Sequence, residues 1–229
     1  MLTSVMQQDV ESKNGIASRH RVRNVIETMI LKGETKSGQK LVQQQLAKKL
    51  GVGQGVVREA LLELQLSGLV DTVDNKGMFV GKLDTEKLME AFDIRMICEG
   101  LMGRLCCSKI TRAQIKELVD IVEKIYSFGL KNQMSEMAFY DKEFHQCLLR
   151  IAGNSLLLRL VESYSAFRKI VRANRDIKVV YEEHLAILKV IENGQEDKAE
   201  DLMRKHILAA KEAIKEQIKN KEFVPHWVT

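Results

Sequence analysis

The chain has 229 residues, of which 45% are hydrophobic and 5% aromatic, with one proline and a formal net charge of +5. This length suits one or two domains with a packed core. Many Leu, Ile, Lys, Glu and Met residues and few helix breakers favour a mainly α-helical protein. Residues 1–15 are polar, and no apolar run approaches the ~20 residues needed to span a membrane. We therefore exclude a membrane protein and expect a soluble, cytoplasmic one.

Positive charge is concentrated in the N-terminal third of the chain. Residues 1–82 contain 12 Lys and Arg against 8 Asp and Glu, whereas the remainder contains 24 against 23. This excess fits a phosphate-bearing partner, although ordinary surface charge explains it equally well in the absence of a motif.

The four cysteines contain no C-x-x-C pair; they are Cys98, Cys106, Cys107 and Cys147. We expect reduced thiols, as in cytosolic proteins, and not a disulfide framework.

The first predicted helix covers residues 19–31 and follows a polar N-terminus, 1–17, that we expect to be flexible. Its apolar residues recur at helical spacing. Arg19, Arg21 and Arg23 lie in its first turns, where the helix dipole disfavours cations. A DNA phosphate nearby would relieve this, and simple solvation of the side chains is an equally good explanation.

Residues 46–68 predict two short helices around a tight turn. Gly51 allows the positive φ that such a turn needs. Apolar residues recur at spacings of three and four on both sides. Arg58 lies off the apolar stripe, near the start of the second helix. This is the layout of a helix-turn-helix, whose second helix enters the DNA major groove with its N-terminal residues nearest the bases.

A β-hairpin is predicted directly after the second of these helices. Residues 69–73 and 78–82 have the pattern of short strands, and Asp74-Asn75-Lys76-Gly77 joins them. Asn and Gly tolerate the backbone conformation of a hairpin turn. Residues 18–82 therefore predict a winged helix-turn-helix DNA-binding domain.

Six further helices are predicted after a domain boundary at 82–84, within a second domain over 83–223 that precedes a tail over 224–229. Thr111 and Gln114 form a capping box. Short connections imply an antiparallel bundle. The expected helices are 85–108, 111–131, 135–152, 154–174, 176–193 and 196–221. The fold class is therefore mainly α, with a winged helix-turn-helix followed by a six-helix bundle.

Three histidines and one aspartate occupy apolar stripes of the bundle helices. Asp141 and His145 lie one turn apart on the third helix, while His184 and His206 belong to the fifth and sixth. A lone histidine in such a stripe is more often a satisfied core residue. Each unpaired polar group would cost on the order of 1–3 kcal/mol, whereas one shared metal ion would satisfy all four. Three imidazoles and a carboxylate suit Zn²⁺, Ni²⁺, Mn²⁺ or Fe²⁺.

The N-terminal part resembles the DNA-binding domain of the GntR family of bacterial transcription regulators. The matching motifs are Leu46-Ala47, Leu50-Gly51-Val52, Val57-Arg58-Glu59-Ala60-Leu61, Ser67-Gly68-Leu69-Val70 and Asn75-Lys76-Gly77. The resemblance implies a palindromic operator in double-stranded DNA, with Arg58 as a DNA-contacting arginine.

The chain departs from this family in the turn before the second helix. Gly53-Gln54-Gly55-Val56 stands where the family usually has Ser-Arg-Thr-Pro, so a typical base-contacting Arg and a phosphate-contacting Thr are missing. A glutamine can still hydrogen-bond an adenine edge. A glycine leaves backbone N–H groups open to a phosphate. The candidate DNA-contacting residues are therefore Arg58, Gln54, Gly55, Gln44, Lys76 and Gly77.

The C-terminal part resembles the FCD ligand-binding domain of the FadR subfamily of these regulators, over about 84–221. The matching motifs are Asp141-Lys142-Glu143-Phe144-His145, Gly153-Asn154, Glu183-His184-Leu185 and His206. Six bundle helices instead of seven make it more similar to the VanR group. The resemblance implies that Asp141, His145, His184 and His206 bind a divalent metal, that a small carboxylate effector binds at the metal, and that the protein is a homodimer.

Four other residues are candidates for contact with the effector. Arg95 matches an arginine that often meets the effector in this family, and it could clamp a carboxylate or form a salt bridge with Glu99 one turn away. Asn154, Arg168 and Tyr140 are weaker candidates for the wall of the pocket.

The leading hypothesis is a homodimeric DNA-binding transcription regulator, a repressor as is usual in the family, controlled by a small organic acid. A metal-dependent enzyme is one alternative, because an Asp/His₃ site with open coordination could activate water. No second base or nucleophile is clearly placed, so we expect no enzymatic activity. The other alternative is a sensor or partner-binding protein with weakened DNA specificity.

Overall fold

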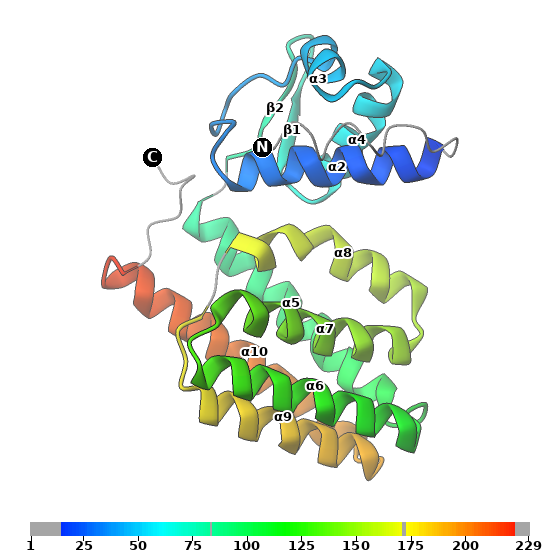
Figure 1. Cartoon of the computed structure of the whole chain (residues 1–229), viewed down its shortest axis with the longest axis vertical. Helices are drawn as coiled ribbons and strands as arrows, with labels where there is room; N and C mark the ends of the chain where they lie inside the picture. Colours follow the sequence, from blue (N-terminus) through cyan, green and yellow to red (C-terminus); the bar gives the residue numbers. More distant parts are fainter. Residues whose placement is uncertain (1–14, 83, 171–172, 223–229) are drawn as a thin grey trace. The chain divides into compact units, whose positions relative to one another are not determined.

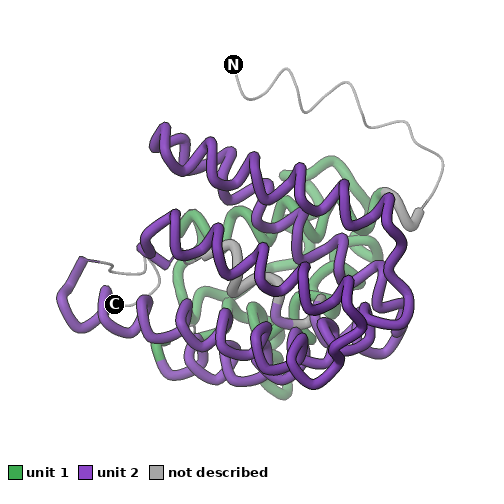
Figure 2. The backbone as a smooth tube through the Cα atoms, turned by 90° about the horizontal axis from the view of Figure 1, so that it is seen from below, with its two compact units in different colours: residues 1–85, 225–229 green, residues 86–224 purple. Residues whose placement is uncertain are grey.

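The computed structural model describes residues 15–82, 84–170 and 173–222, without the side chains of 15–17, 162, 163 and 165–170. Helices predominate, and strands β1 and β2 form a small sheet (Figure 1). The chain divides into two compact units, one ending at Thr85 and the other beginning at Glu86 (Figure 2). Within the described ranges, no helix is both long and apolar enough to cross a membrane.

The first unit is the predicted winged helix-turn-helix. Gly51 ends helix α3 with a φ of 66°, the left-handed conformation that the tight turn was expected to need. The two strands pair antiparallel from Val70 opposite Val80 to Val73 opposite Gly77. Its elements are α2 (Gly15–Leu31), α3 (Gln43–Leu50), α4 (Gln54–Leu66), β1 (Val70–Val73) and β2 (Gly77–Val80).

Helix α2 begins earlier than predicted, at Gly15 instead of residue 19. Its N-terminal arginines lie beside acidic residues of α4: Nε of Arg19 is 2.7 Å from Oε1 of Glu63, and Nε of Arg23 is 3.9 Å from Oε2 of the same residue. These carboxylates offset the unfavourable position of the cations near a helix start. The predicted flexible segment 1–17 lies outside the described residues up to position 14, and the predicted tail 224–229 lies outside them entirely.

The second unit contains the six predicted helices, each within a few residues of its expected bounds. Thr111 and Gln114 form the predicted capping box at the start of α6. Gly153 ends α7 in the left-handed conformation, with a φ of 58°. The helices are α5 (Thr85–Cys106), α6 (Arg112–Leu130), α7 (Met134–Ala152), α8 (Ser155–Ile170), α9 (Ile177–Glu192) and α10 (Glu196–Lys219).

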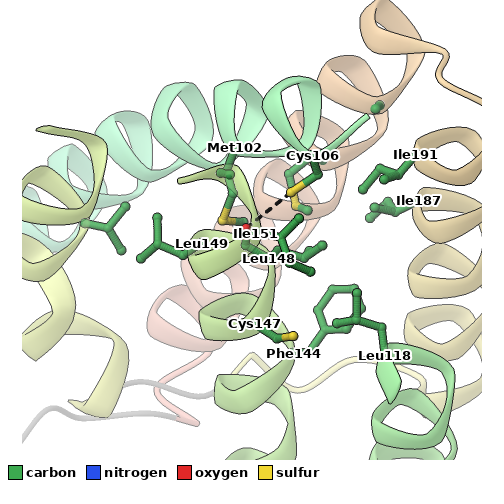
Figure 3. Close-up of a cluster of buried hydrophobic side chains, with 14 of the residues drawn as sticks. Met102, Cys106, Leu118, Phe144, Cys147, Leu148, Leu149, Ile151, Ile187 and Ile191 are labelled. Carbon is green, nitrogen blue, oxygen red and sulfur yellow. Dashed lines mark hydrogen bonds between the residues drawn. The ribbon is translucent and has the colours of Figure 1, made fainter. Parts of the chain in front are cut away.

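The core of the second unit lies where α6 packs against α7 and α9, and α9 packs against α10. Figure 3 shows its central side chains, among them Phe144, Leu118 and Ile187, all fully buried. The Cys106 thiol donates a hydrogen bond to the backbone carbonyl of Leu148 at 3.2 Å. Burial, with a smaller contribution from the neighbouring cysteines, raises the pKa of Cys106 to about 12. All four cysteines are free thiols, as expected.

Candidate functional site

Three histidines from three helices meet inside the second unit. His145 lies on α7, His184 on α9 and His206 on α10, and all three are buried. One potential ligand atom from each lies within 4.8 Å of the others. Two nitrogens bound to one zinc ion in tetrahedral geometry are about 3.4 Å apart, so the three rings would move closer together to bind one ion. The structure therefore places the three predicted histidines close together, in a cluster that could hold a metal ion.

His184 provides the strongest test of whether the cluster fits a metal. Its side chain is 0% exposed, and among the described residues neither ring nitrogen has a hydrogen-bond partner. Burial, reinforced by the neighbouring His206, lowers the pKa of His184 well below its ordinary value, so the ring is neutral. Neutral imidazole is the form that binds metals. A metal ion would satisfy a buried nitrogen that otherwise costs on the order of 1–3 kcal/mol.

Asp141 lies at the edge of this cluster. Its side chain is 38% exposed, and Oδ1 is 3.9 Å from Nε2 of His184. The ion-pair contact partly opposes the effect of burial on the pKa of His184. Of the four predicted ligands, the structure therefore brings three into a cluster and places the fourth, which is partly exposed, at its edge.

Two carboxylates that we did not predict from the sequence contact Nδ1 of two of the histidines. Nδ1 of His145 lies 2.6 Å from Oε2 of Glu99, and Nδ1 of His206 hydrogen-bonds Oε2 of Glu183 at 2.7 Å. A carboxylate at the second nitrogen of a metal-binding histidine is common, because it fixes the ring and its tautomer. One sequence signal was available: Glu183 directly precedes His184.

Each of these carboxylates is also paired with an arginine. Nε of Arg95 donates a hydrogen bond to Oε1 of Glu99 at 2.9 Å, so the salt bridge considered for Arg95 is present. Arg175 donates a hydrogen bond to Glu183. Burial alone would raise the pKa of Glu183, but the bonds from His206 and Arg175 outweigh it and lower that pKa, so the carboxylate is ionised.

For the other candidates for contact with the effector, the structure gives contacts outside the histidine cluster. Asn154 caps α8, with Oδ1 accepting hydrogen bonds from the N–H groups of Leu156 and Leu157 at 3.1 and 3.0 Å. The ring of Tyr140 stacks on that of Phe128, with 5.5 Å between centroids. The side chain of Arg168 lies outside the described residues.

The six candidate DNA-contacting residues are all exposed in the first unit. Gln54 is the first residue of α4, and Arg58 lies one turn further along the same helix. The position of a Cβ on Gly55 has no atom within 4 Å, so a partner can approach the backbone there. Lys76 is in the hairpin turn, and Gly77 begins β2 with a φ of 103°. Gln44 lies in the first turn of α3.

Models of known protein families match both units of the chain. Residues 18–80 match the model described as bacterial regulatory proteins, gntR family, and residues 90–209 match the FCD domain. The chain belongs to the GntR family. The combination of these two domains is consistent with the FadR-like subfamily, and the predicted resemblance is confirmed.

Its relatives in this family are named as transcriptional regulators. The Nta operon transcriptional regulator of Aminobacter aminovorans is 29% identical over 172 residues, covering 74% of this chain and 81% of the relative. The HTH-type transcriptional regulator LutR of Bacillus subtilis is 26% identical over 212 residues, covering 81% and 96%. Among solved structures, McbR/YncC of E. coli has the same fold, with a TM-score of 0.69 at 18% identity, covering 88% of this chain and 98% of that one. This GntR protein is thus a DNA-binding transcriptional regulator.

Proposed function

We propose that this protein is a cytoplasmic, homodimeric repressor whose DNA binding is controlled by a small carboxylate bound at a divalent metal in the helical unit. Asp141, His145, His184 and His206 would hold the metal. The observation that carries this proposal is the fully buried ring of His184, whose nitrogens have no hydrogen-bond partner in the described part of the chain and which lies among two further histidines.

The charges around the cluster support an anionic effector. Glu99 is balanced by Arg95, and Glu183 by Arg175, so these two pairs add no net charge. Histidines bind a metal as neutral imidazoles, so the carboxylate of Asp141 is the one formal charge of the proposed ligand set. A divalent ion would therefore give the site a formal net charge of about +1, which favours one carboxylate.

The metal would act as a Lewis acid that binds an oxygen of the effector carboxylate. Three neutral imidazoles and one carboxylate suit Zn²⁺, Ni²⁺, Mn²⁺ or Fe²⁺. The partial exposure of Asp141 supports an effector entering on that side of the cluster. Arg95, Asn154, Arg168 and Tyr140 remain candidates for contacts with the rest of the effector.

The DNA partner would be a palindromic operator bound by two winged helices. Half-sites one helical turn apart, about 34 Å, are typical for helix-turn-helix dimers. Arg58, Gln54 and Gly55 near the start of α4 would face the major groove, with Gln44, Lys76 and Gly77 around them. An effector can release DNA only if it binds more tightly to a dimer geometry that docks poorly, and such couplings are typically about 1–3 kcal/mol.

Two experiments test the proposal separately. Elemental analysis of the purified protein should find a transition metal, and His145→Ala should lose it; equal metal content in both proteins would refute the metal site. In a fluorescence titration, the native upstream promoter fragment should bind in a salt-sensitive way and more tightly than a scrambled fragment of equal length. Absence of that preference would refute operator recognition.

A further inference from the structure

Two histidines of the cluster each contact a glutamate that is paired with an arginine, and we call each Arg–Glu–His chain of contacts a relay. In one, Arg95 contacts Glu99, which contacts His145; in the other, Arg175 contacts Glu183, which contacts His206. Both relays reach Nδ1 of their histidine and leave Nε2 on the opposite side of the ring. They come from different parts of the chain, because Arg95 and Glu99 lie on α5, whereas Glu183 lies on α9 and Arg175 precedes it.

Resting on the metal site proposed above, we propose that these two Arg–Glu pairs are positioning elements of that site. Each carboxylate would hold the Nδ1–H tautomer of one histidine, so that the Nε2 lone pair is presented to the ion. The arginines would hold the carboxylates in place. Neither arginine nor carboxylate would touch the metal itself.

The burial of Glu99, in the relay that ends at His145, supports this role. Glu99 is 1% exposed, and an ionised carboxylate in such a place is costly unless it is paired. A buried ion pair is often no more stabilising than apolar side chains of similar size. Simple stability therefore gives little reason to place one against His145, whereas orientation of a metal-binding ring gives a specific reason.

The relay that ends at His206 is the more practical one to test, because Glu183 is 28% exposed and its replacement should not disrupt the core. Glu183→Ala should weaken Zn²⁺ binding by about 10–100-fold, the usual effect of removing such a partner. Glu183→Gln should lose less, because its amide oxygen can still accept the Nδ1–H bond. Glu182→Ala is the matched control: it removes a carboxylate from the preceding, exposed position of α9 and should bind Zn²⁺ as the wild type does.

The tautomer itself can be measured without metal. In ¹⁵N-histidine correlation spectra of the metal-free full chain above pH 8, His145 and His206 should carry the proton on Nδ1. Glu183→Ala should shift His206 toward a mixture of tautomers and leave His145 unchanged. An Nε2–H tautomer of both rings in the wild type would overturn the inference, as would Zn²⁺ affinity of Glu183→Ala equal to that of Glu182→Ala. If the wild type bound no Zn²⁺, the metal site would fail, and the tautomers would still decide whether the relays orient the rings.

Discussion

Replacement of His184 by leucine separates a metal ligand from an ordinary core histidine. The ring is 0% exposed and neither nitrogen is hydrogen-bonded within the described residues, so the change to leucine removes no hydrogen bond in the metal-free protein. Leucine is similar in volume and leaves little cavity. In a chelator, His184→Leu should therefore unfold with a free energy equal to that of the wild type or about 1–3 kcal/mol higher, because it removes unsatisfied polar atoms.

The difference should shift in favour of the wild type when metal is added. Zn²⁺ at 100 times its dissociation constant would stabilise the wild type by about 2.7 kcal/mol. For a unit of this size, each kcal/mol shifts the midpoint by roughly 4 °C, so the wild type should gain roughly 10 °C. The variant lacks one ligand and should gain much less.

Calorimetric melts of both proteins in chelator and in Zn²⁺ would measure these four midpoints. His20→Leu is a suitable control, because His20 is an exposed histidine of α2 in the other unit and its loss should leave the metal response unchanged. If His184→Leu were destabilised equally in chelator and in Zn²⁺, His184 would be a packing residue and our reasoning about the metal would be wrong.

Three further predictions concern the scaffold and the DNA-binding surface. Gly51→Ala should destabilise the first unit by about 1–2 kcal/mol, because its φ is 66°, whereas Gly55→Ala, inside helix α4 and with equally open space, should not; urea unfolding measures both. Phe144→Ala should cost about 3–5 kcal/mol in the same assay, since Phe144 is fully buried in the main core. Arg58→Ala should weaken operator binding by about 1–3 kcal/mol in fluorescence anisotropy, while Arg112→Ala, an equally exposed change on α6, should leave affinity unchanged.

Local chemistry explains why most element boundaries could be predicted. The left-handed Gly51 and Gly153, the capping box at Thr111 and the hairpin turn ending at Gly77 are each fixed by a few neighbouring residues. By contrast, the contacts of Glu63 with the arginines of α2 could not be predicted in this way, because Glu63 is far away in the sequence.

The histidine cluster shows the same division between local pattern and tertiary contact. An apolar stripe identifies which face of a helix is buried, and from it we could predict that His145, His184 and His206 point into the same core. It does not give the rotation of one helix against another, on which the contacts of polar neighbours depend. Glu99 therefore looked like the partner of Arg95 alone, although its second oxygen lies against His145. Hence the sequence reveals the groups that could bind a metal, whereas only the packed helices reveal the groups that could orient them.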